Sequence, residues 1–506
     1  MAAMSVIETM TPKSVALVGL TLLVAAWIVQ TVFTAITSPL RQVPGPWYSL
    51  FTNQILKNAV TGGRRIFYID SMHQKYGPVV RISPDEVAVS DIEGFKQIHA
   101  VSSKFTKNIW YEKLTNFPRH SVFTKRDPKD HAQRRRLFAR GFSKSYMREN
   151  WEGVIKAKCK QAVEKMREDA VKGSCDILKW SSFMAADIIG CVGFGESFGL
   201  LEAGQKTEYI RVLELALVGN GIGAELPWLR AILARIPAKP LQETFNSSNY
   251  ILSYGKKAVE NAKRHGEDSN LMAAVLAEAA KENSSLDDLD VQTEATSLIF
   301  AGSGTTANTL TYLLWCVLQR PELQRALEAE VASLHDDPSD AELEQLPLFN
   351  ATIQEVLRLY CAVPGSLPRV APAGGAKIGG YYIPEGVTCS TQAYTLHRDP
   401  ASWGNPHDDR FLPERHLQAN IDKRPAEELK NGRTTSCAFG AGAYTCLGQH
   451  MAWMELRLAA AYFFRMCKGA ELGPTANEDM QLENYFVITP KGKKCEISLR
   501  QSVENV

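Results

Sequence analysis

A long uncharged stretch near the N-terminus constrains this 506-residue chain more than any other feature. From Ser14 to Leu40 there is no Asp, Glu, Lys or Arg, and residues 14–36 are mostly Val, Leu, Ala and Ile. At about 1.5 Å per residue, a helix of residues 14–36 is roughly 34 Å long, sufficient to cross a hydrocarbon core of about 30 Å. A cleaved signal peptide is the alternative, but its apolar run is normally about 7–15 residues and no A-x-A cleavage site follows. The stretch therefore predicts a transmembrane anchor.

The flanks of this stretch predict its topology. Basic residues follow it at positions 41, 57, 64 and 65, whereas Glu8 and Lys13 precede it, and the more basic flank of a membrane helix usually faces the cytosol. We expect residues 1–13 to form a luminal tail, 14–36 the anchor, 37–50 a hinge and 51–506 one catalytic domain. The hinge contains Pro44-Gly45-Pro46, which cannot continue a helix.

Composition limits the kind of activity. Lys plus Arg number 57 and Asp plus Glu 55, so the net charge of +2 gives no support to nucleic-acid binding. The ten cysteines include no CxxC pair and no cluster with zinc spacing, which favours free thiols in a cytosolic domain.

Helical patterning dominates the remainder of the chain. Short strands are expected within 75–91, 368–396 and 485–499, and no repeat or linker divides the soluble part. Helices are expected at 150–172, 177–192, 205–219, 241–265, 268–281, 289–319, 321–335, 348–361 and 447–467. The pattern predicts one mainly α domain with small β-sheets.

A glycine-rich loop around one cysteine is the most informative motif. In residues 437–453 (CAFGAGAYTCLGQHMAW), glycines surround Cys446 and an apolar helix follows. Glycines allow tight turns and close approach to a flat cofactor. A cysteine at a helix start meets unpaired amide donors and the positive end of the helix dipole, which favour the thiolate, a ligand of haem iron. A buried structural cysteine is the alternative for Cys446 taken alone.

Phe439-x-x-Gly442-x-Tyr444-x-Cys446-x-Gly448 resembles the cysteine-ligand loop of the cytochrome P450 family. The resemblance implies that Cys446 is the axial ligand of haem b and that Phe439 and Gly440 contact this cofactor. The family usually has Arg, or sometimes His, where this chain has Tyr444. A tyrosine hydroxyl can donate a hydrogen bond to a haem propionate but brings no positive charge.

Residues 298–307 interrupt an apolar helical pattern with two glycines and two threonines, against helix propensity. Thr305 can donate a hydrogen bond to the carbonyl of Ala301, bending or opening the helix, and the glycines leave room beside a cofactor. The segment resembles the oxygen-binding helix of the family, which implies that Thr305 is catalytic and helps deliver protons to bound oxygen. Gly304 stands where the family has an acid, so one member of the usual proton relay is missing.

Two more groups of residues fit the resemblance. Glu355 and Arg358 lie three residues apart on one helix face and can pair, and Arg415 supplies a second arginine. They resemble the E-x-x-R and P-E-R motifs, which form a structural network behind the haem. Propionate contacts are implied for His131, Arg135 and Arg369. The arginines at 134–136 and 140 are otherwise a solvated basic face or a docking site for a reductase.

The resemblance implies the cytochrome P450 fold, a single haem-burying domain behind a single-pass anchor in the endoplasmic reticulum membrane. The implied reaction inserts one atom of O2 into a lipophilic substrate, with electrons from NADPH–cytochrome P450 reductase and cytochrome b5 as a further candidate partner. The sequence is similar to fungal members of secondary metabolism, which favours a terpenoid, polyketide or alkaloid substrate. We expect the substrate pocket to contain Trp110, Tyr111, Phe117, Phe300, Ala301, Val363, Leu367 and Phe486.

Two alternatives remain for the function. One is a haem-thiolate isomerase or dehydratase that acts without a reductase, which Gly304 favours and Thr305 disfavours. The other is a non-catalytic haem-binding sensor.

Overall fold

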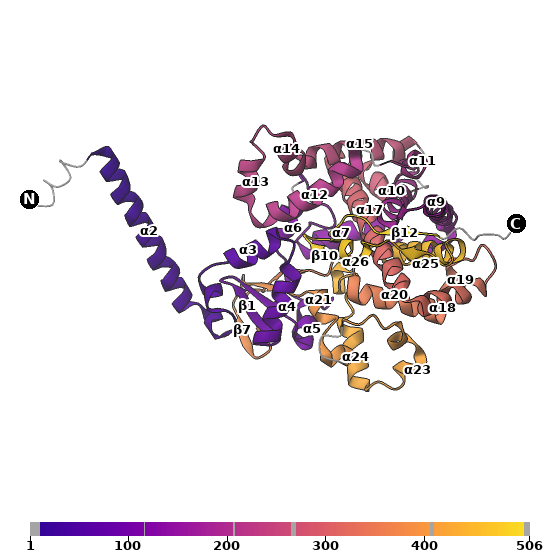
Figure 1. Ribbon diagram of the computed structural model, residues 1–506. Helices are drawn as coiled ribbons and strands as arrows, with labels where there is room; N and C mark the ends of the chain where they lie inside the picture. Colours follow the sequence, from indigo (N-terminus) through magenta and orange to yellow (C-terminus); the bar gives the residue numbers. More distant parts are fainter. Residues whose placement is uncertain (1–10, 116, 206–207, 265–269, 405–408, 500–506) are drawn as a thin grey trace, which may run out of the picture.

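The computed structural model describes residues 11–115, 117–205, 208–264, 270–404 and 409–499 (Figure 1). The predicted luminal tail lies mostly outside these residues. Long helices pack around a central helix, α17 (Asp288–Leu318), and three of its neighbours are α10 (Ile177–Phe194), α15 (Ser247–Arg264) and α25 (Gln449–Met466). This arrangement confirms the prediction of a mainly α fold with small sheets.

Further helices surround these four. They are α3 (Gln54–Thr61), α4 (Arg65–Tyr76), α5 (Ile92–His99), α6 (Trp110–Thr115), α7 (Pro128–Ala139), α8 (Lys144–Asn150), α9 (Glu152–Val171), α11 (Leu200–Ala203), α12 (Glu208–Glu225), α13 (Pro227–Leu233), α14 (Lys239–Phe245), α16 (Ala273–Ala279), α18 (Pro321–Ala332), α19 (Asp340–Leu343), α20 (Pro347–Tyr360), α21 (Ala393–Leu396), α22 (Pro400–Trp403), α23 (Gln418–Ile421), α24 (Ala426–Thr435) and α26 (Ala476–Asp479). Four 3-10 turns are η1 (Pro39–Gln42), η2 (Trp47–Leu50), η3 (Pro413–His416) and η4 (Gly442–Tyr444). The prediction of one helix over 241–265 is wrong, because the chain breaks at Asn246, a residue type that favours helix ends over helix interiors.

The main sheet has the strand order β1-β2-β8-β5-β3. Its strands are β1 (Val79–Ser83), β2 (Glu86–Val89), β8 (Thr388–Ser390), β5 (Arg369–Val370) and β3 (Thr106–Lys107). The antiparallel pairing of β3 with β5 puts Lys107 opposite Arg369. The smaller sheets contain β4 (Cys175–Asp176), β6 (Ala376–Ile378), β7 (Tyr381–Ile383), β9 (Glu471–Leu472), β10 (Leu482–Asn484), β11 (Ile488–Pro490) and β12 (Glu496–Ser498).

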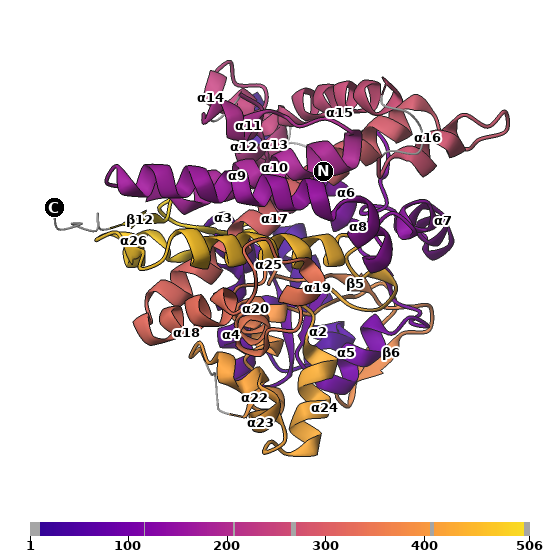
Figure 2. The ribbon, with the colours of Figure 1, turned by 90° about the vertical axis from the view of Figure 1, so that its right-hand side faces the viewer.

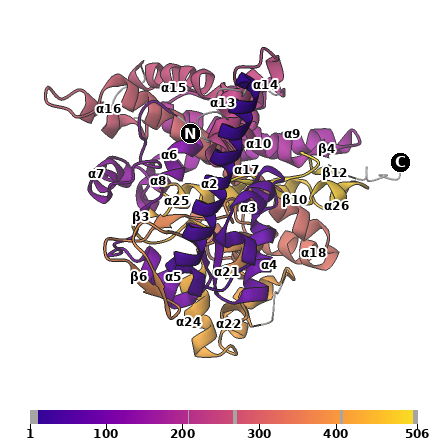
Figure 3. The ribbon, with the colours of Figure 1, turned by 90° about the vertical axis from the view of Figure 1, so that its left-hand side faces the viewer.

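The N-terminal apolar segment forms one helix, α2 (Pro12–Thr37), that extends away from the body (Figures 1 and 3). Its most apolar window has a mean hydropathy of 2.2 and none of that window is buried. Helix α10 is also long and apolar, but 78% of its window is buried in the core. Helix α2 is therefore the candidate membrane anchor, and α10 is a core helix.

Arg81 fixes the direction in which the chain leaves α2. Its buried guanidinium on β1 donates hydrogen bonds to the carbonyls of Leu40, Val43 and Pro46, at 3.0, 2.8 and 3.2 Å. The backbone N–H of Arg81 also donates to the carbonyl of Pro44, at 2.7 Å. These bonds satisfy the carbonyl groups that a proline-containing segment cannot pair within a helix. The segment after α2 is thus held against the main sheet.

Candidate active site

The loop that carries Cys446 connects η4 to α25. The N–H of Cys446 donates to the carbonyl of Phe439, at 2.8 Å, which closes the loop. Gly442 has a φ of 64°, and a Cβ atom there would collide with the carbonyl oxygen of His99. Only glycine therefore fits at this turn. Cys446 itself is exposed, whereas the loop residues from Ala438 to Thr445 are half-buried.

The surroundings of Cys446 have opposing effects on the pKa of its thiol. The surrounding protein atoms partly desolvate the accessible sulfur and raise the pKa of the thiol, while a hydrogen bond from the Gly448 backbone and the positive charge of Arg135 lower it. The net direction is upward, although the backbone N–H of Gly448 at the helix start favours the thiolate, as the sequence predicts. The two stabilising groups are nevertheless aimed at the sulfur, where they would support an anion that a bound metal ion also stabilises.

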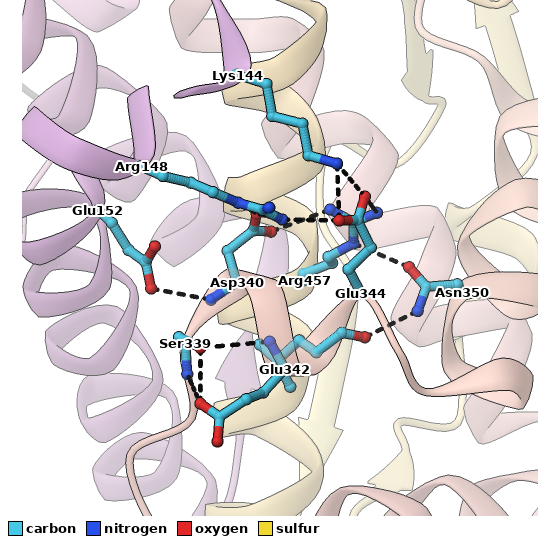
Figure 4. A network of polar contacts seen from close by, with 10 residues as sticks. Lys144, Arg148, Glu152, Ser339, Asp340, Glu342, Glu344, Asn350 and Arg457 are labelled. Atoms are coloured by element: carbon cyan, nitrogen blue, oxygen red, sulfur yellow. Dashed lines mark hydrogen bonds and ion pairs between the residues drawn. The ribbon is translucent and has the colours of Figure 1, made fainter. Parts of the chain in front are cut away.

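An ion-pair network fixes the helix behind this loop. On α25, Arg457 pairs with Asp340 at 3.0 Å and with Glu344 at 3.3 Å. Arg148 of α8 pairs with the same two carboxylates, and Lys144 pairs with Glu344 (Figure 4). The hydrogen bond from Lys144 contributes most to lowering the pKa of Glu344 to about 2. The network anchors α25 to α8 and α19, and α9 runs alongside α25 (Figure 2).

The middle of α17 has the hydrogen bond that its sequence predicts. The Thr305 hydroxyl donates to the carbonyl of Ala301 at 2.8 Å, yet α17 remains a continuous α-helix, so the expected opening is absent from it. Ala301 is exposed, and a Cβ at Gly304 would have no described heavy atom within 4 Å. Gly302 differs, because a Cβ there would meet Ile189 of α10 at 2.9 Å. Gly304 therefore leaves room, whereas Gly302 serves close helix packing.

A buried group of cations surrounds Tyr444. Arg369 lies 4.4 Å from the centre of its ring and Lys107 lies 4.7 Å from it. The ring of His131 is 4.6 Å from that of Tyr444, and Arg135 donates to the carbonyl of Thr445 at 2.6 Å. Burial and these cations lower the pKa of His131 to about 3, which keeps its imidazole neutral at neutral pH.

Among the residues that the structure describes, Arg369 and Lys107 have no carboxylate partner of the kind that buried charges normally require. Arg369 donates to the hydroxyl of Tyr111 at 2.9 Å, but its buried Nε has no partner among the residues that the structure describes. Lys107 is 3% exposed and, within the described residues, donates to the carbonyls of Val122, at 3.3 Å, and Phe123, at 2.7 Å. Burial and the charges of Arg369 and Arg135 hold the pKa of Lys107 well below its ordinary value. The cluster therefore suits an anionic group.

Sequence reasoning missed Lys107. A lysine in a two-residue strand carries no motif, and its burial follows from the pairing of β3 with β5. The sequence indicates the burial of Lys107 only weakly, through its position between the apolar residues Phe105 and Ile109.

Glu355 is the centre of the predicted ion-pair group. It is 0% exposed and pairs with Arg358 at 2.7 Å, Arg415 at 3.0 Å and His416 at 2.8 Å. Burial alone would raise the pKa of Glu355, but the hydrogen bonds from Arg358 and His416 hold it well below its ordinary value. The contact of His416 with this carboxylate was also missed from the sequence.

Arg134 does not lie on a solvated face. It is buried and pairs with Glu294 of α17 at 2.6 Å. Glu294 also accepts the N–H of Val122, at 2.9 Å, so it ties the loop after α6 to α17. Burial raises the pKa of Glu294 to about 7, against the opposing charge of Arg134. Of the four neighbouring arginines, Arg136 and Arg140 are exposed.

Aromatic rings gather where the substrate pocket is expected. The rings of Trp110 and Phe486 lie 5.8 Å apart, and those of Phe123 and Phe486 5.9 Å apart. Trp110 and Phe486 line a cavity of about 250 Å³ that also contains Arg65 and Glu225, whose carboxylate accepts the Trp110 N–H at 3.0 Å. The sequence did not predict the charged residues Arg65 and Glu225 in the lining of this cavity.

The other expected pocket residues are distributed around this region. Tyr111 is buried, and its hydroxyl is engaged by Arg369, which places it with the cation cluster. Phe117 and Phe300 are partly buried against the main core. Val363 and Leu367 are half-buried in the segment between α20 and β5.

Comparisons with known proteins relate most of the chain to one family. The profile of the family described as Cytochrome P450 matches residues 43–497. The cytochrome P450 monooxygenase cypX of Dothistroma septosporum is 39% identical over 487 residues, covering 94% of this chain and 93% of that relative. The cytochrome P450 monooxygenase stcB of Emericella nidulans is 40% identical over 488 residues, covering 93% and 90%. The cytochrome P450 monooxygenase aflV of Aspergillus parasiticus is 38% identical over 495 residues, covering 94% and 95%.

Proposed function

Because this chain belongs to the cytochrome P450 family, we propose that Cys446 is the thiolate ligand of its haem iron and that the haem is haem b. The chain is a haem monooxygenase that acts on a lipophilic substrate with O2 and a redox partner. The proposal concerns the residues that hold the cofactor and the partners that serve it.

The residues present fit haem b. The group has an iron atom, a flat apolar ring and two carboxylates. Cys446 offers an accessible sulfur, and Gly304 leaves open space on α17. Buried Lys107 and Arg369 and half-buried Arg135 form a cluster that pairs with no described carboxylate. This unpaired cationic cluster beside the Cys446 loop is the observation that carries the proposal, since two propionates would offset two of its three positive charges.

Each residue then has a definite task. Bound haem iron supplies the activation of O2, favoured by electron density from the thiolate. Gly448 and Arg135 stabilise the Cys446 anion. Arg135, Arg369 and Lys107 hold the propionates, and the charge of Lys107 takes the place of the arginine that Tyr444 replaces. Thr305 holds a proton at its hydroxyl beside the open part of α17, and Glu355 with Arg358 and Arg415 supports the loop from behind.

The aromatic lining around Trp110, Phe123 and Phe486 supports a lipophilic, ring-containing substrate. The relatives named above are fungal monooxygenases. We therefore assign the substrate to fungal secondary metabolism, as a terpenoid, polyketide or alkaloid.

The electrons are proposed to come from NADPH–cytochrome P450 reductase, with cytochrome b5 as a second donor. We assign the docking of the reductase to Arg136 and Arg140. The neighbouring cations Arg134, Lys144 and Arg148 are already paired with carboxylates. Helix α2 is proposed to anchor the protein in the endoplasmic reticulum membrane, with residues 51–506 in the cytosol as one catalytic domain. Exposed Trp228 and Ile232 on α13 support this, since α13 lies on the side from which α2 extends (Figures 1 and 3).

The test combines the full-length chain in lipid with purified reductase, NADPH and a panel of aromatic polyketides under ¹⁸O2. The expected product contains one ¹⁸O atom, forms only with reductase and NADPH, and decreases strongly in Thr305→Ala. Product formed without reductase, and without ¹⁸O, would instead show an isomerase or dehydratase. Haem binding with neither product would favour a sensor.

A further inference from the structure

The cavity of about 250 Å³ that Trp110 lines contains an arginine with unused hydrogen-bond donors. Arg65, the first residue of α4, donates from Nε and Nη2 to the hydroxyl of Ser366, and from Nη2 to Glu86 at 2.8 Å. Its Nη1 donates to no residue that the structure describes, and it lies 3.8 Å from Oε1 of Glu225, which is longer than a hydrogen bond. Arg65 therefore presents two free N–H groups at this gap.

Glu225, the last residue of α12, supplies an acceptor on the other side of the gap. Its Oε1 accepts the indole N–H of Trp110 at 3.0 Å, and its Oε2 accepts no hydrogen bond from the described residues. The side chain of Glu225 is 18% exposed, so it is largely withdrawn from bulk water. Ser366 and Glu86 hold the guanidinium of Arg65, while Trp110 holds this carboxylate. The fold therefore fixes the gap from both sides.

A hydroxyl group fits this gap, because its oxygen both accepts and donates a hydrogen bond. An oxygen about 2.8 Å from Nη1 of Arg65 and from a carboxylate oxygen of Glu225 bridges atoms that are 3.8 Å apart. Water fills the same position, but it leaves the rings of Trp110 and Phe486 uncovered, and these rings lie 5.8 Å apart beside the gap. A phenol supplies both the hydroxyl and a ring that packs against them.

The charges in the lining favour a neutral group over an ion. They balance, because the lining contains three cations and three carboxylates, and burying a further charge is costly. The charged residues are Lys57, Arg65, Lys113, Asp85, Glu86 and Glu225. A phenol is neutral at neutral pH and adds no charge to this balance.

This cavity adjoins the proposed haem site. Asn108 and Pro368 line it, and they are the chain neighbours of Lys107 and Arg369 in the cation cluster that we assign to the propionates. Its volume of about 250 Å³ is below the roughly 300–1,000 Å³ of pockets that enclose a drug-sized ligand. The cavity therefore holds one ring of a larger substrate rather than the whole molecule.

We propose that this cavity is a substrate subsite that recognises a phenolic hydroxyl, with Arg65 donating to the phenol oxygen and Glu225 accepting the phenol O–H. The inference rests on the proposed function and narrows its substrate to an aromatic compound that carries a phenol. The phenol ring packs against Trp110 and Phe486, and the remainder of the substrate extends toward the haem site. The hydroxyl keeps its proton throughout. Arg65 and Glu225 determine specificity and take no part in the oxidation.

Equilibrium dialysis of the full-length, haem-loaded protein in lipid nanodiscs, against empty nanodiscs, tests this. The probes are β-naphthol and its methyl ether, which share a ring system and differ in the O–H that Glu225 accepts. A hydrogen bond to a charged group corresponds to roughly tenfold or more in affinity, so wild type should bind naphthol at least about tenfold more tightly than the ether. Glu225→Gln should lower this ratio roughly tenfold and leave the affinity for the ether unchanged.

The matched control is Glu243→Gln. The side chain of Glu243 on α14 is 20% exposed, close to the 18% of Glu225, and it is ion-paired with Arg211, but it does not line the cavity. This variant should keep the wild-type ratio of the two affinities.

Three results would overturn the proposal. One is a wild-type protein that binds the ether as tightly as naphthol, a comparison that needs no variant. Another is a Glu225→Gln protein with the wild-type ratio, which would show that the hydroxyl binds elsewhere. The third is equal weakening of both probes in Glu225→Gln, which would show a purely structural role. The reduced, carbon-monoxide-bound spectrum of the same samples tests the proposed function separately, because the dialysis requires no turnover.

Discussion

Replacing Lys107 with methionine should weaken haem binding without lowering the free energy of unfolding of the haem-free protein. The ammonium group of Lys107 is buried beside Arg369 and Arg135, which lower its pKa, and it is held by two carbonyl groups. A hydrogen bond between two charged groups contributes about 1.5–3 kcal/mol. Loss of one such bond to a propionate therefore corresponds to roughly tenfold to hundredfold weaker haem binding, at about 1.4 kcal/mol per tenfold.

The assay is the rate of haem transfer from the full-length protein to an excess of apomyoglobin. Lys107→Met should lose haem about ten to a hundred times faster than wild type. The control is Lys104→Met, because Lys104 is exposed and precedes the same strand. In the haem-free state, urea unfolding should show Lys107→Met to be no less stable, since the substitution removes a buried cation from a group of cations. Haem loss at the wild-type rate, or an apoprotein that is strongly destabilised, would refute the assignment of Lys107 to a propionate.

Three further outcomes follow. Glu355→Gln leaves two buried arginines without their carboxylate and should cost about 3–5 kcal/mol in urea unfolding, whereas exposed Glu414→Gln should change little; equal stability of both would contradict the network. Burial on α25 raises the pKa of Glu455 from 4.5 to about 8, so its stabilising effect is complete below pH 4.5 and is lost as the pH rises to about 8. Wild type should therefore lose up to about 5 kcal/mol relative to Glu455→Gln across this range, and parallel stability–pH curves would refute the raised pKa. Trp228 is 60% exposed on α13, so in a chain without residues 1–37, Trp228→Ser should reduce co-sedimentation with lipid vesicles, while unchanged binding would exclude α13 from the membrane surface.

The sequence predicted the features that depend on local patterns. The apolar run of α2, the length of α17 and the turn around Cys446 follow from composition and spacing within one segment. The hydrogen bond from Thr305 to Ala301 was predictable for the same reason, because both residues lie one helical turn apart.

Features that depend on distant segments were not predictable. Arg134 looked solvated because its partner Glu294 lies 160 positions further along the chain. Lys107 is buried because β3 pairs with β5, more than 260 positions away. Glu455 is buried without a hydrogen-bond partner among the described residues because α25 packs between α9 and α17. In each case the burial of a polar group is decided by tertiary packing, which residue type alone does not encode.

The most direct test of the central claim is the spectrum of the reduced, carbon-monoxide-bound protein, recorded for wild type, Cys446→Ala and Cys437→Ala. Cys437 lies in the same loop but is buried and serves as the control. We predict the strongly red-shifted Soret band of a thiolate ligand in wild type and Cys437→Ala, and its loss in Cys446→Ala. A wild-type band typical of a neutral ligand, or a thiolate band that survives in Cys446→Ala, would contradict the assignment of Cys446 as the ligand of the haem iron.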